Sequence, residues 1–369
     1  MRICLVYDCL FPHTVGGAER WYRNLAERLG ADGHEVTYLT LRQWEATPDT
    51  AGFEVRAVGP RMALYTRGGR RRLVPPLVFG AGVLWHLLRN RGRYEVVHTA
   101  SFPYFSVLAA AAARLGGRFA LVVDWHEVWS REYWGEYLGP AGRLGWWVQA
   151  RCARVRQRAF CFSRLHARRL RSIGGPEAVV LEGEYAGPLE PPDPRPAEPV
   201  VIFAGRLIPE KRAPAVLPAV ERARERVPGL RCAIYGDGPE RAELERQGAH
   251  VNGFVPAEEV TAALGSALCL LLPSRREGYG LIVVEAAVAG TPSVVVAGPD
   301  NAATELVEDG VNGFVAESAS PADLAEAVLR VHDRGMALRR STADWFARNA
   351  SRLSLDSSLE RVVQSYRAA

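Results

Sequence analysis

Four residues in the second half of the chain combine cations and carboxylates in a pattern suited to a phosphorylated ligand. Arg206 and Lys211 follow one apolar, strand-like run, and Glu277 and Glu285 follow another. A planar guanidinium and a compact ammonium together suit the two phosphates of a diphosphate. The carboxylates can accept hydrogen bonds from hydroxyl groups. The set therefore predicts a site for a ligand that carries both phosphates and hydroxyls, although each residue alone could belong to a solvated loop or a helix cap.

Lysine usage strengthens this prediction. Lys211 is the only lysine among 46 basic side chains. Arginine serves everywhere else on the chain, so a lone lysine indicates a position where a point charge is needed.

The residues around Glu277 predict a close approach of backbone to ligand. Gly278 and Gly280 flank Tyr279, and the helix that contains Glu285 follows from Leu281. Glycines allow the backbone to lie against a ligand, and a helix start offers free N–H groups to an anion. We expect a phosphate-binding turn here.

The elements that carry these residues predict an α/β fold. Apolar runs alternate with amphipathic segments, as in doubly wound parallel sheets whose ligands bind beyond the carboxyl ends of the strands. We expect an amino-terminal domain over residues 1–186, a proline-rich linker at 187–199, a second domain at 200–342, and helices at 343–369 that cross back to the first domain. The expected strands are 1–8, 35–41, 53–58, 95–98, 118–124, 159–162 and 178–181, then 200–204, 230–235, 249–252, 268–272 and 293–296.

The first domain offers fewer candidates. Gly16 and Gly17 follow its first strand, and the pair would let the backbone approach phosphate or acceptor. His126 follows the strand at 118–124, a position where a histidine is a better functional candidate than one buried at random.

Composition sets limits on the class of protein. The length of 369 residues suits two domains, and no apolar run approaches the roughly 20 residues that span a bilayer. The start lacks the features of a secretory signal, and the six cysteines form no C-x-x-C pair. We expect a cytoplasmic protein with reduced cysteines. No D-x-D motif is present, so we expect no metal.

Five motifs in the second half resemble glycosyltransferase family 4. They are Arg206 with Lys211, YGDGP from Tyr235, NGFV from Asn252, EGYG from Glu277 followed by Glu285-Ala286, and AGTP from Ala289. The resemblance implies the GT-B fold, two doubly wound Rossmann-like domains facing across a cleft, and a retaining transfer of sugar from a nucleoside diphosphate.

The same resemblance implies roles for individual residues. In the family, positions matching Arg206 and Lys211 bind the diphosphate, Glu285 the ribose, and 277–281 the sugar. The implied catalytic residues are Arg206, Lys211, Glu277 and His126, and the implied donor-binding residues are Gly16, Gly17, Gly205, Gly236, Val255, Gly278, Tyr279, Gly280, Leu281 and Glu285. Asp8 and Glu19 are expected on the acceptor side. Neither a cofactor nor a metal is expected, because the nucleotide sugar is a substrate and the diphosphate itself would take the acceptor proton.

Donor and acceptor stay open. A uridine diphosphate sugar of the glucose or N-acetylglucosamine type is the first expectation, with guanosine diphosphate mannose as the alternative. The acceptor is a natural-product aglycone such as an aminocyclitol, a lipid or a polysaccharide. Two arginine clusters, residues 61–72 and 151–171, would either contact anionic lipid or form a solvated face.

Three other functions are weighed against transfer. One is a nucleotide-sugar epimerase on the same fold, and another is a non-catalytic nucleotide-sugar-binding protein. Nucleic-acid binding is not expected, since no reading motif accompanies the arginines.

Overall fold

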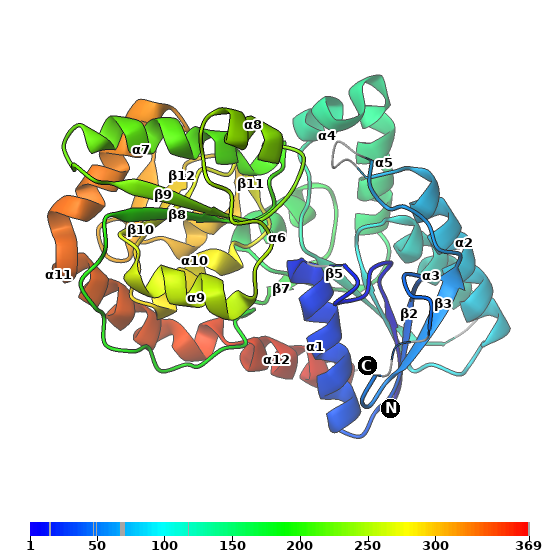
Figure 1. Ribbon diagram of the computed structural model, residues 1–369. Coiled ribbons are helices and arrows are strands. Elements are labelled where there is room, and N and C mark those ends of the chain that lie inside the picture. The colour runs from blue at the N-terminus through cyan, green and yellow to red at the C-terminus, as the bar shows by residue number, and fades with distance from the viewer. Residues whose placement is uncertain (15, 47, 49, 67–70, 117, 368–369) are drawn as a thin grey trace. The chain divides into compact units, whose positions relative to one another are not determined.

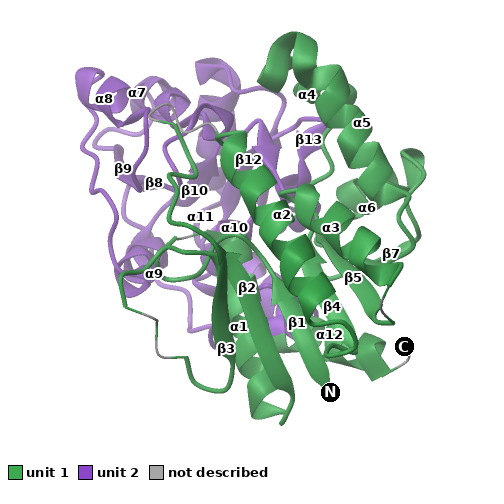
Figure 2. Cartoon of the chain, turned by 90° about the vertical axis from the view of Figure 1, so that its right-hand side faces the viewer, with its two compact units in different colours: residues 1–66, 70–182, 356–369 green, residues 67–69, 183–355 purple. Residues whose placement is uncertain are grey.

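The chain divides into two units in the computed structural model, which describes residues 1–14, 16–46, 48, 50–66, 71–116 and 118–367. The first unit contains the described residues of 1–66, 71–182 and 356–367, and the second contains 183–355 (Figure 2).

The first unit is built on a seven-stranded parallel sheet in the order β3-β2-β1-β4-β5-β6-β7. Its strands are β1 (Arg2–Val6), β2 (Glu35–Leu41), β3 (Glu54–Gly59), β4 (Val96–Ala100), β5 (Ala120–Trp125), β6 (Arg158–Cys161) and β7 (Ala178–Val180). Its helices are α1 (Gly17–Ala31), α2 (Val74–Arg89), α3 (Phe105–Arg114), α4 (Arg131–Leu138), α5 (Gly142–Ala153), α6 (Arg164–Ser172) and α12 (Leu355–Arg367). Every residue of β4 is buried, as expected for a central strand covered on both faces.

The strand order reverses between β1 and β4, which is where such sheets bind ligands. Helices α2 and α3 lie on one face of the sheet and α1 lies on the other (Figures 1 and 2). Right-handed crossovers require this arrangement, because the chain travels in opposite directions along the sheet before and after β3.

The second unit has a five-stranded parallel sheet in the order β14-β12-β10-β8-β9 and a two-stranded sheet of β11 and β13. The strands are β8 (Val200–Ala204), β9 (Arg231–Tyr235), β10 (Cys269–Leu272), β11 (Arg276–Glu277), β12 (Ser293–Val296), β13 (Asp300–Asn301) and β14 (Gly313–Ala316). The helices are α7 (Val216–Arg224), α8 (Arg241–Arg246), α9 (Ala257–Ser266), α10 (Leu281–Val288) and α11 (Pro321–Leu353), with short 3-10 turns η2 (Pro209–Lys211), η3 (Ala213–Ala215) and η4 (Ala302–Leu306).

Several strand expectations differ from the structure, and the two-residue strands β11 and β13 were not expected. Residues 249–252 form no regular strand, because Val251 makes only an isolated bridge to Ile234 before the chain turns at Gly253, whose φ is +75°. Strand β14 was not expected, since Asn312-Gly313 reads as a turn, yet Gly313 sits in the strand with its Cα against the Ser293 carbonyl of β12.

The domain boundaries also lie elsewhere than expected. The chain passes between units at 182/183 and 355/356, so the proline-rich segment 187–199 belongs to the second unit. Helix α11 continues past residue 343, and only α12 joins the first unit. The two segments where the chain changes unit lie side by side. Tyr185 N–H donates to Leu353 O at 3.1 Å, and Leu355 N–H donates to Tyr185 O at 2.8 Å.

Helix α12 is anchored to the first unit by polar contacts. The Tyr366 hydroxyl hydrogen-bonds His98 Nδ1 inside the core, and Arg28 Nη1 lies 3.0 Å from Asp356 Oδ1 at the surface.

Candidate functional site

The only lysine forms an ion pair with the first of the predicted carboxylates. Lys211 Nζ lies 2.5 Å from Glu277 Oε1, and the Ser274 hydroxyl donates to the same oxygen at 2.8 Å. The Lys211 side chain is 18% exposed and that of Glu277 is 8% exposed. Lys211 follows β8, whereas Ser274 and Glu277 follow the neighbouring strand β10. Adjacent parallel strands therefore bring a cation, a carboxylate and a hydroxyl together at one sheet edge.

The loop that carries Lys211 is held in an uncommon conformation. Arg212 has φ +52°, the only positive φ of a non-glycine residue in the described chain. The left-handed conformation costs a non-glycine residue about 1–2 kcal/mol of conformational energy. The Arg275 N–H donates to Glu210 O at 2.8 Å, which ties this loop to the loop of Glu277. This hydrogen bond helps to offset the cost of the Arg212 conformation and fixes the backbone at Lys211.

Asn301, which the sequence analysis did not single out, supports the loop of Glu277. Its Nδ2 donates to Ser274 O at 3.1 Å and to Val296 O at 2.8 Å, and its Oδ1 accepts from Ala303 N–H. Asn301 is buried and lies opposite Glu277 in the two-stranded sheet. The carboxylate is therefore positioned by a satisfied buried amide.

Gly280 is required for two separate reasons. It precedes α10 with φ +108°, a conformation that favours glycine. A Cβ there would also lie 2.7 Å from Ala303 Cβ. Tyr279 beside it is buried, and Gly278 is half-buried. The predicted glycine turn thus brings the start of α10 close behind Glu277.

Helix α10 presents one partly accessible face. Leu281, Ile282 and Glu285 are half-buried, whereas the intervening Val283 and Val284 are buried. Burial and the nearby Glu285 carboxylate raise the pKa of Tyr185, which places Tyr185 in the electrostatic field of this face.

The loops after β8 and β9 touch backbone to backbone. A Cβ on Gly236 would lie 1.9 Å from Gly205 O, and Gly236 N–H donates to Gly253 O at 2.8 Å. The predicted glycines therefore meet, and Val255 follows two residues after Gly253. Arg206, next to Gly205, has an exposed side chain.

In the first unit, His126 lies at the carboxyl end of β5 as a neutral imidazole. Its ring stacks on Phe162 at 4.3 Å and meets Tyr22 edge-on at 6.2 Å. Burial lowers its pKa to about 4, although the Asp124 and Glu127 carboxylates act in the opposite direction. Its Nε2 has no hydrogen-bond partner within the described residues. A neutral imidazole in this state can serve as a hydrogen-bonding group but not as a cation at neutral pH.

The end of β5 is fixed by Asp124. Trp21 Nε1 donates to Asp124 Oδ2 at 2.7 Å, and His98 Nε2 lies 2.8 Å from Oδ1. Burial opposes ionisation, but the electrostatic interaction with His98 and these hydrogen bonds keep the Asp124 pKa below its usual value. Asp124 is fully buried, so it positions its neighbours rather than meeting a ligand.

Asp8 is ion-paired with Arg71, a residue that the sequence analysis placed in a surface cluster. The Arg71 guanidinium contacts Asp8 Oδ2, and the two side chains are 8% and 0% exposed. Arg71 also lies over the Phe102 ring at 5.4 Å. For this residue, the expectation that the cluster at 61–72 is a solvated or lipid-facing surface is wrong, because a buried carboxylate draws the guanidinium inward.

Glu19 occupies the start of α1. A Cβ on Gly16 would lie 2.4 Å from Glu19 Oε2, and Gly17 begins the helix. A carboxylate three residues after the cap compensates the positive end of the helix. It thereby competes with any phosphate at the predicted Gly16-Gly17 contact.

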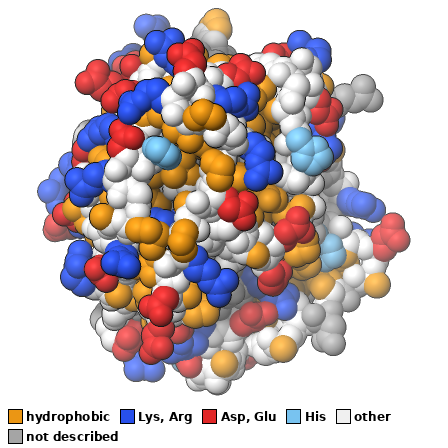
Figure 3. Space-filling model, turned by 60° about the vertical axis from the view of Figure 1, so that its left-hand side comes forward, with side chains coloured by type: hydrophobic (Ala, Val, Ile, Leu, Met, Phe, Trp, Pro, Cys, Tyr) orange, Lys and Arg blue, Asp and Glu red, His pale blue; other side chains and the backbone are white. Residues whose placement is uncertain are grey.

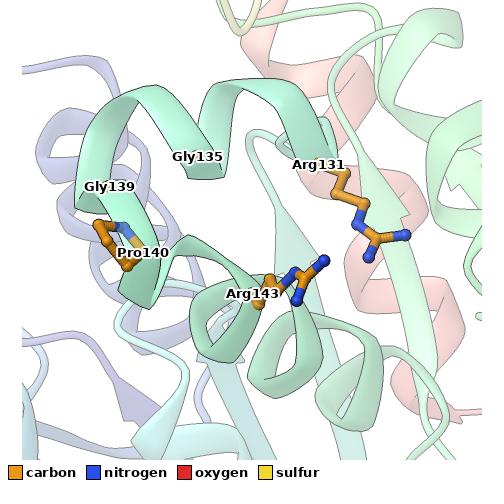
Figure 4. A pocket seen from close by; sticks show the side chains of 5 residues that line it. All are labelled: Arg131, Gly135, Gly139, Pro140 and Arg143. Carbon is orange, nitrogen blue, oxygen red and sulfur yellow. The ribbon is translucent and has the colours of Figure 1, made fainter.

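A surface pocket of about 390 Å³ lies elsewhere in the first unit, over α4 and α5 (Figure 4). It is lined by Arg131, Gly135, Gly139, Pro140 and Arg143. It contains none of the predicted site residues.

The described residues hold no group of three or more histidine, cysteine, aspartate or glutamate side chains placed to bind a metal ion. Within the same residues, no helix combines the length and apolarity needed to cross a membrane.

Two family models match the chain. The Glycosyltransferase Family 4 model matches residues 15–181, and the "Glycosyl transferases group 1" model matches residues 198–334.

Curated relatives match over segments. An alpha-D-kanosaminyltransferase of Streptomyces kanamyceticus is 27% identical over 46% of this chain and 45% of its own length. A D-inositol 3-phosphate glycosyltransferase of a Nocardioides species is 31% identical over 46% of this chain and 42% of its own. A GDP-mannose-dependent phosphatidylinositol monomannoside mannosyltransferase of Mycolicibacterium smegmatis is 35% identical over 32% and 35%. The chain thus spans less than half the length of these relatives.

Solved structures match over the whole chain. HepE of Anabaena in complex with UDP-glucose aligns over 100% of both chains at 17% identity with a TM-score of 0.74. WaaG, a glycosyltransferase involved in lipopolysaccharide biosynthesis, aligns over 100% of both at 19% identity and the same score. At this identity the likeness shows the fold, which is GT-B. With the two family models together reaching from residue 15 to residue 334, the chain belongs to glycosyltransferase family 4.

Proposed function

We propose that this protein transfers a sugar from a nucleoside diphosphate donor to a hydroxyl acceptor, with retention of the anomeric configuration and without a metal ion. The observation that carries the proposal is the cluster of Lys211, Glu277 and Ser274 at the carboxyl ends of β8 and β10, beside a glycine-capped helix.

The cations stabilise the leaving group. Arg206 is exposed, and Lys211 retains part of its surface although it is paired. Negative charge grows on the diphosphate as the glycosidic bond breaks, so fixed cations and the start of α10 bind the transition state more strongly than the ground state.

Glu277 holds the sugar. Its Oε1 already accepts from Lys211 and Ser274, and its carboxylate is held by the strand pairing of β11. A carboxylate oriented in this way accepts from sugar hydroxyls, and its link to Lys211 couples sugar position to diphosphate position. Glu285, on the accessible face of α10, binds the ribose.

His126 supplies a neutral hydrogen bond at the reacting centre. Because its pKa is about 4, the imidazole does not carry a charge that would compete for the diphosphate. The diphosphate itself takes the acceptor proton, so no residue needs to act as a base.

Asp8 shapes the acceptor side through its ion pair with Arg71 rather than by direct contact, since it is fully buried. Glu19 stays at the start of α1, so a hydroxyl acceptor suits that position better than a phosphate does.

The donor proposal remains a uridine diphosphate sugar, with guanosine diphosphate mannose second, because the relatives include a GDP-mannose-dependent enzyme. For the acceptor we propose an aminocyclitol or a related polyol, since one relative is named as a D-inositol 3-phosphate glycosyltransferase.

The test incubates the purified protein with a panel of nucleotide sugars, with and without chelator, and measures release of nucleoside diphosphate. Lys211→Ala and Glu285→Ala are compared with Arg222→Ala and Glu221→Ala, which change charged residues of α7. We expect one donor to turn over regardless of chelator, and only the first two variants to lose activity.

Stereochemistry is read from the anomeric proton coupling of the product by NMR. Release of diphosphate with inversion, or only with added metal, contradicts those parts of the proposal. Epimerised donor without diphosphate release indicates the epimerase instead, and binding without turnover indicates the binding protein.

A further inference from the structure

The surface pocket over α4 and α5 brings two arginines together without an acidic residue. Arg131 lies at the start of α4 and Arg143 near the start of α5, and the other three lining residues are Gly135, Gly139 and Pro140. Figure 4 shows the two guanidinium groups turned toward one another beside the turn between the helices. Like charges brought together are unfavourable unless an anion lies between them. We call this cavity the arginine pocket.

Neither arginine of this pocket is neutralised by the protein. In the part of the chain that the structure describes, no carboxylate forms an ion pair with Arg131 or Arg143. Glu132 and Glu136 also lie on α4, but each is turned about 100° around the helix from Arg131 and Gly135. Neither of these acidic residues lines the pocket.

Other arginines of the same unit do have acidic partners. Arg164 pairs with Glu182 at 2.9 Å, and Arg171 pairs with Glu177 at 2.7 Å. Figure 3 likewise shows one face of the molecule where acidic and basic side chains are interspersed. The arginine pocket differs from such surfaces, because its two cations are left for a ligand.

An aromatic ring holds Arg131 in place. The guanidinium carbon lies 5.5 Å from the centroid of the Trp146 ring of α5, and Trp146 is half-buried. A guanidinium stacked on a ring keeps the N–H groups at its edge available for hydrogen bonds. Arg131 therefore loses less conformational freedom when it binds an anion than a freely rotating arginine would.

Four glycines shape the walls of the pocket. A Cβ on Gly142 would lie 2.3 Å from Trp134 O, and one on Gly145 would lie 2.3 Å from Trp134 Cε3, so α5 packs directly on α4. By contrast, a Cβ on Gly135 or Gly139 would meet no atom within 4 Å. The first two glycines therefore fix the angle between the helices, and the other two leave a hollow open beside the arginines.

A buried amide anchors the two helices to the rest of the unit. Gln149 Oε1 of α5 accepts from the Tyr104 hydroxyl at 2.8 Å, from Trp129 N–H at 2.9 Å and from Trp134 Nε1 at 3.3 Å. Its Nε2 donates to Trp129 O at 2.9 Å. The arginine pocket is therefore formed before a ligand arrives, as is usual for small-molecule sites.

The pair of guanidinium groups suits a tetrahedral anion better than a planar one. One guanidinium already satisfies both oxygens of a carboxylate. A phosphate monoester has three terminal oxygens and a charge of about −1.5 to −2 at pH 7, so two arginines from different helices can bind it together. The pocket volume of about 390 Å³ lies within the range of roughly 300–1,000 Å³ for small-molecule sites, which leaves room for an organic group beside the phosphate.

We propose that the arginine pocket binds the phosphate of a small, water-soluble phosphomonoester through Arg131 and Arg143. The wall formed by the glycines receives the organic group. This site is separate from the predicted diphosphate site, whose Arg206 and Lys211 belong to the second unit. The inference holds whatever sugar the protein transfers.

The experiment is isothermal titration calorimetry of the full chain with glucose 6-phosphate, in parallel with glucose and with glucuronate. We expect glucose 6-phosphate to bind with an affinity that falls with salt, and the other two to bind roughly tenfold or more weakly. Arg131→Gln/Arg143→Gln should weaken the binding of glucose 6-phosphate roughly tenfold or more. Lys211→Met should retain this binding, because it changes only the diphosphate site.

Two further variants control for charge and for position. Arg89→Gln/Arg91→Gln removes two charges from exposed arginines outside the pocket and should bind like the unchanged protein. Gly135→Leu keeps both arginines but fills the hollow, so it should bind glucose 6-phosphate roughly tenfold more weakly. Circular dichroism checks that each variant is folded.

Four results would overturn the proposal. They are no binding of glucose 6-phosphate by the unchanged protein, equal affinity for glucuronate, an equal loss of binding in the control double and in the pocket double, and normal binding by Gly135→Leu.

Discussion

Two charged side chains of the candidate site in the second unit, Arg206 and Lys211, keep part of their surface accessible, whereas Asp8 and Asp124 of the first unit are fully buried. Arg206 is exposed and the Lys211 side chain is 18% exposed, although its partner Glu277 is buried. In the first unit, Asp8 is ion-paired with Arg71, and Asp124 Oδ1 lies 2.8 Å from His98 Nε2.

Under the proposed function, this difference corresponds to a division of labour. A unit that binds a diphosphate must present charge to its ligand, and partial exposure keeps Lys211 able to exchange partners. A buried ion pair cannot exchange partners without a large desolvation cost. Such pairs therefore hold the fold of the first unit, and its contacts with a ligand would be aromatic and neutral. His126, kept neutral by burial, fits that description.

The largest expected effect comes from breaking the Lys211–Glu277 pair. Lys211→Met should lower kcat/KM by roughly a thousandfold, because a cation on the leaving group is lost. Steady-state kinetics with the donor found in the panel measures it. Arg222→Met on α7 is the control and should be near neutral.

The double variant Lys211→Met/Glu277→Leu separates function from structure. If the pair only stabilises the fold, replacing both partners should restore activity, since neither charge is left alone. We expect the double to be at least as inactive as the single, and recovery would contradict the role given to Lys211.

The second effect concerns the buried pair of the first unit. Asp8→Asn or Arg71→Met should each lower the free energy of unfolding by about 3 kcal/mol, because one buried charge loses its partner. The double variant should regain most of this loss. Eight of the nine tryptophans lie in the first unit, so denaturation followed by tryptophan fluorescence reports on it.

An exposed pair provides the comparison. Arg171 and Glu177 lie 2.7 Å apart with side chains 68% and 84% exposed. Arg171→Met should change stability by less than about 1 kcal/mol. Equal changes in the free energy of unfolding at the two pairs would contradict the difference expected between a buried and an exposed ion pair.

The sequence alone was sufficient to predict structural features that depend on residues close together in one motif. Apolar runs predicted most strands of the two larger sheets, and Gly278 and Gly280 predicted the turn before α10. Such features are local, since a positive φ or a strand end depends on a few neighbouring residues.

Partners far apart in sequence could not be predicted. Arg71 and Asp8 are 63 positions apart, and Asn301 reaches Ser274 across 27. Nothing in the local composition distinguishes Arg71 from Arg72, yet one is buried and the other exposed, because only the fold brings a carboxylate to Arg71. Strand β14 was missed for the same reason: Gly313 is read as a turn until its packing on β12 is known.

The third effect tests the glycine turn. Gly280→Ala should destabilise the second unit by about 2 kcal/mol, because it combines a positive φ with a contact to Ala303. Gly229→Ala is the matched control, with φ +83° and open space around the added Cβ, and should cost about 1 kcal/mol.

Nucleotide affinity separates the two glycine variants further. Displacing the start of α10 should weaken nucleoside diphosphate binding roughly tenfold in Gly280→Ala, measured by calorimetry, while Gly229→Ala binds normally. Equal affinities would show that the start of α10 does not contact the diphosphate.

The smallest effect is the pH dependence that His126 contributes to the first unit. Its pKa is about 4 in the folded protein and about 6.5 when unfolded, so the unfolded state binds more protons between these values. The contribution of neutral His126 to the free energy of unfolding is complete above about pH 6.5 and declines as the pH falls toward 4. His126→Phe, which can keep the stacking on Phe162, should therefore lose about 1 kcal/mol less stability than the unchanged protein between pH 7 and about pH 5.5. His86, with a pKa also lowered to about 4 by burial, contributes equally to both proteins, so their difference isolates His126.

The same variant should reduce turnover at pH 7, and loss of turnover without the change in pH dependence would mean that His126 is accessible and charged rather than buried and neutral.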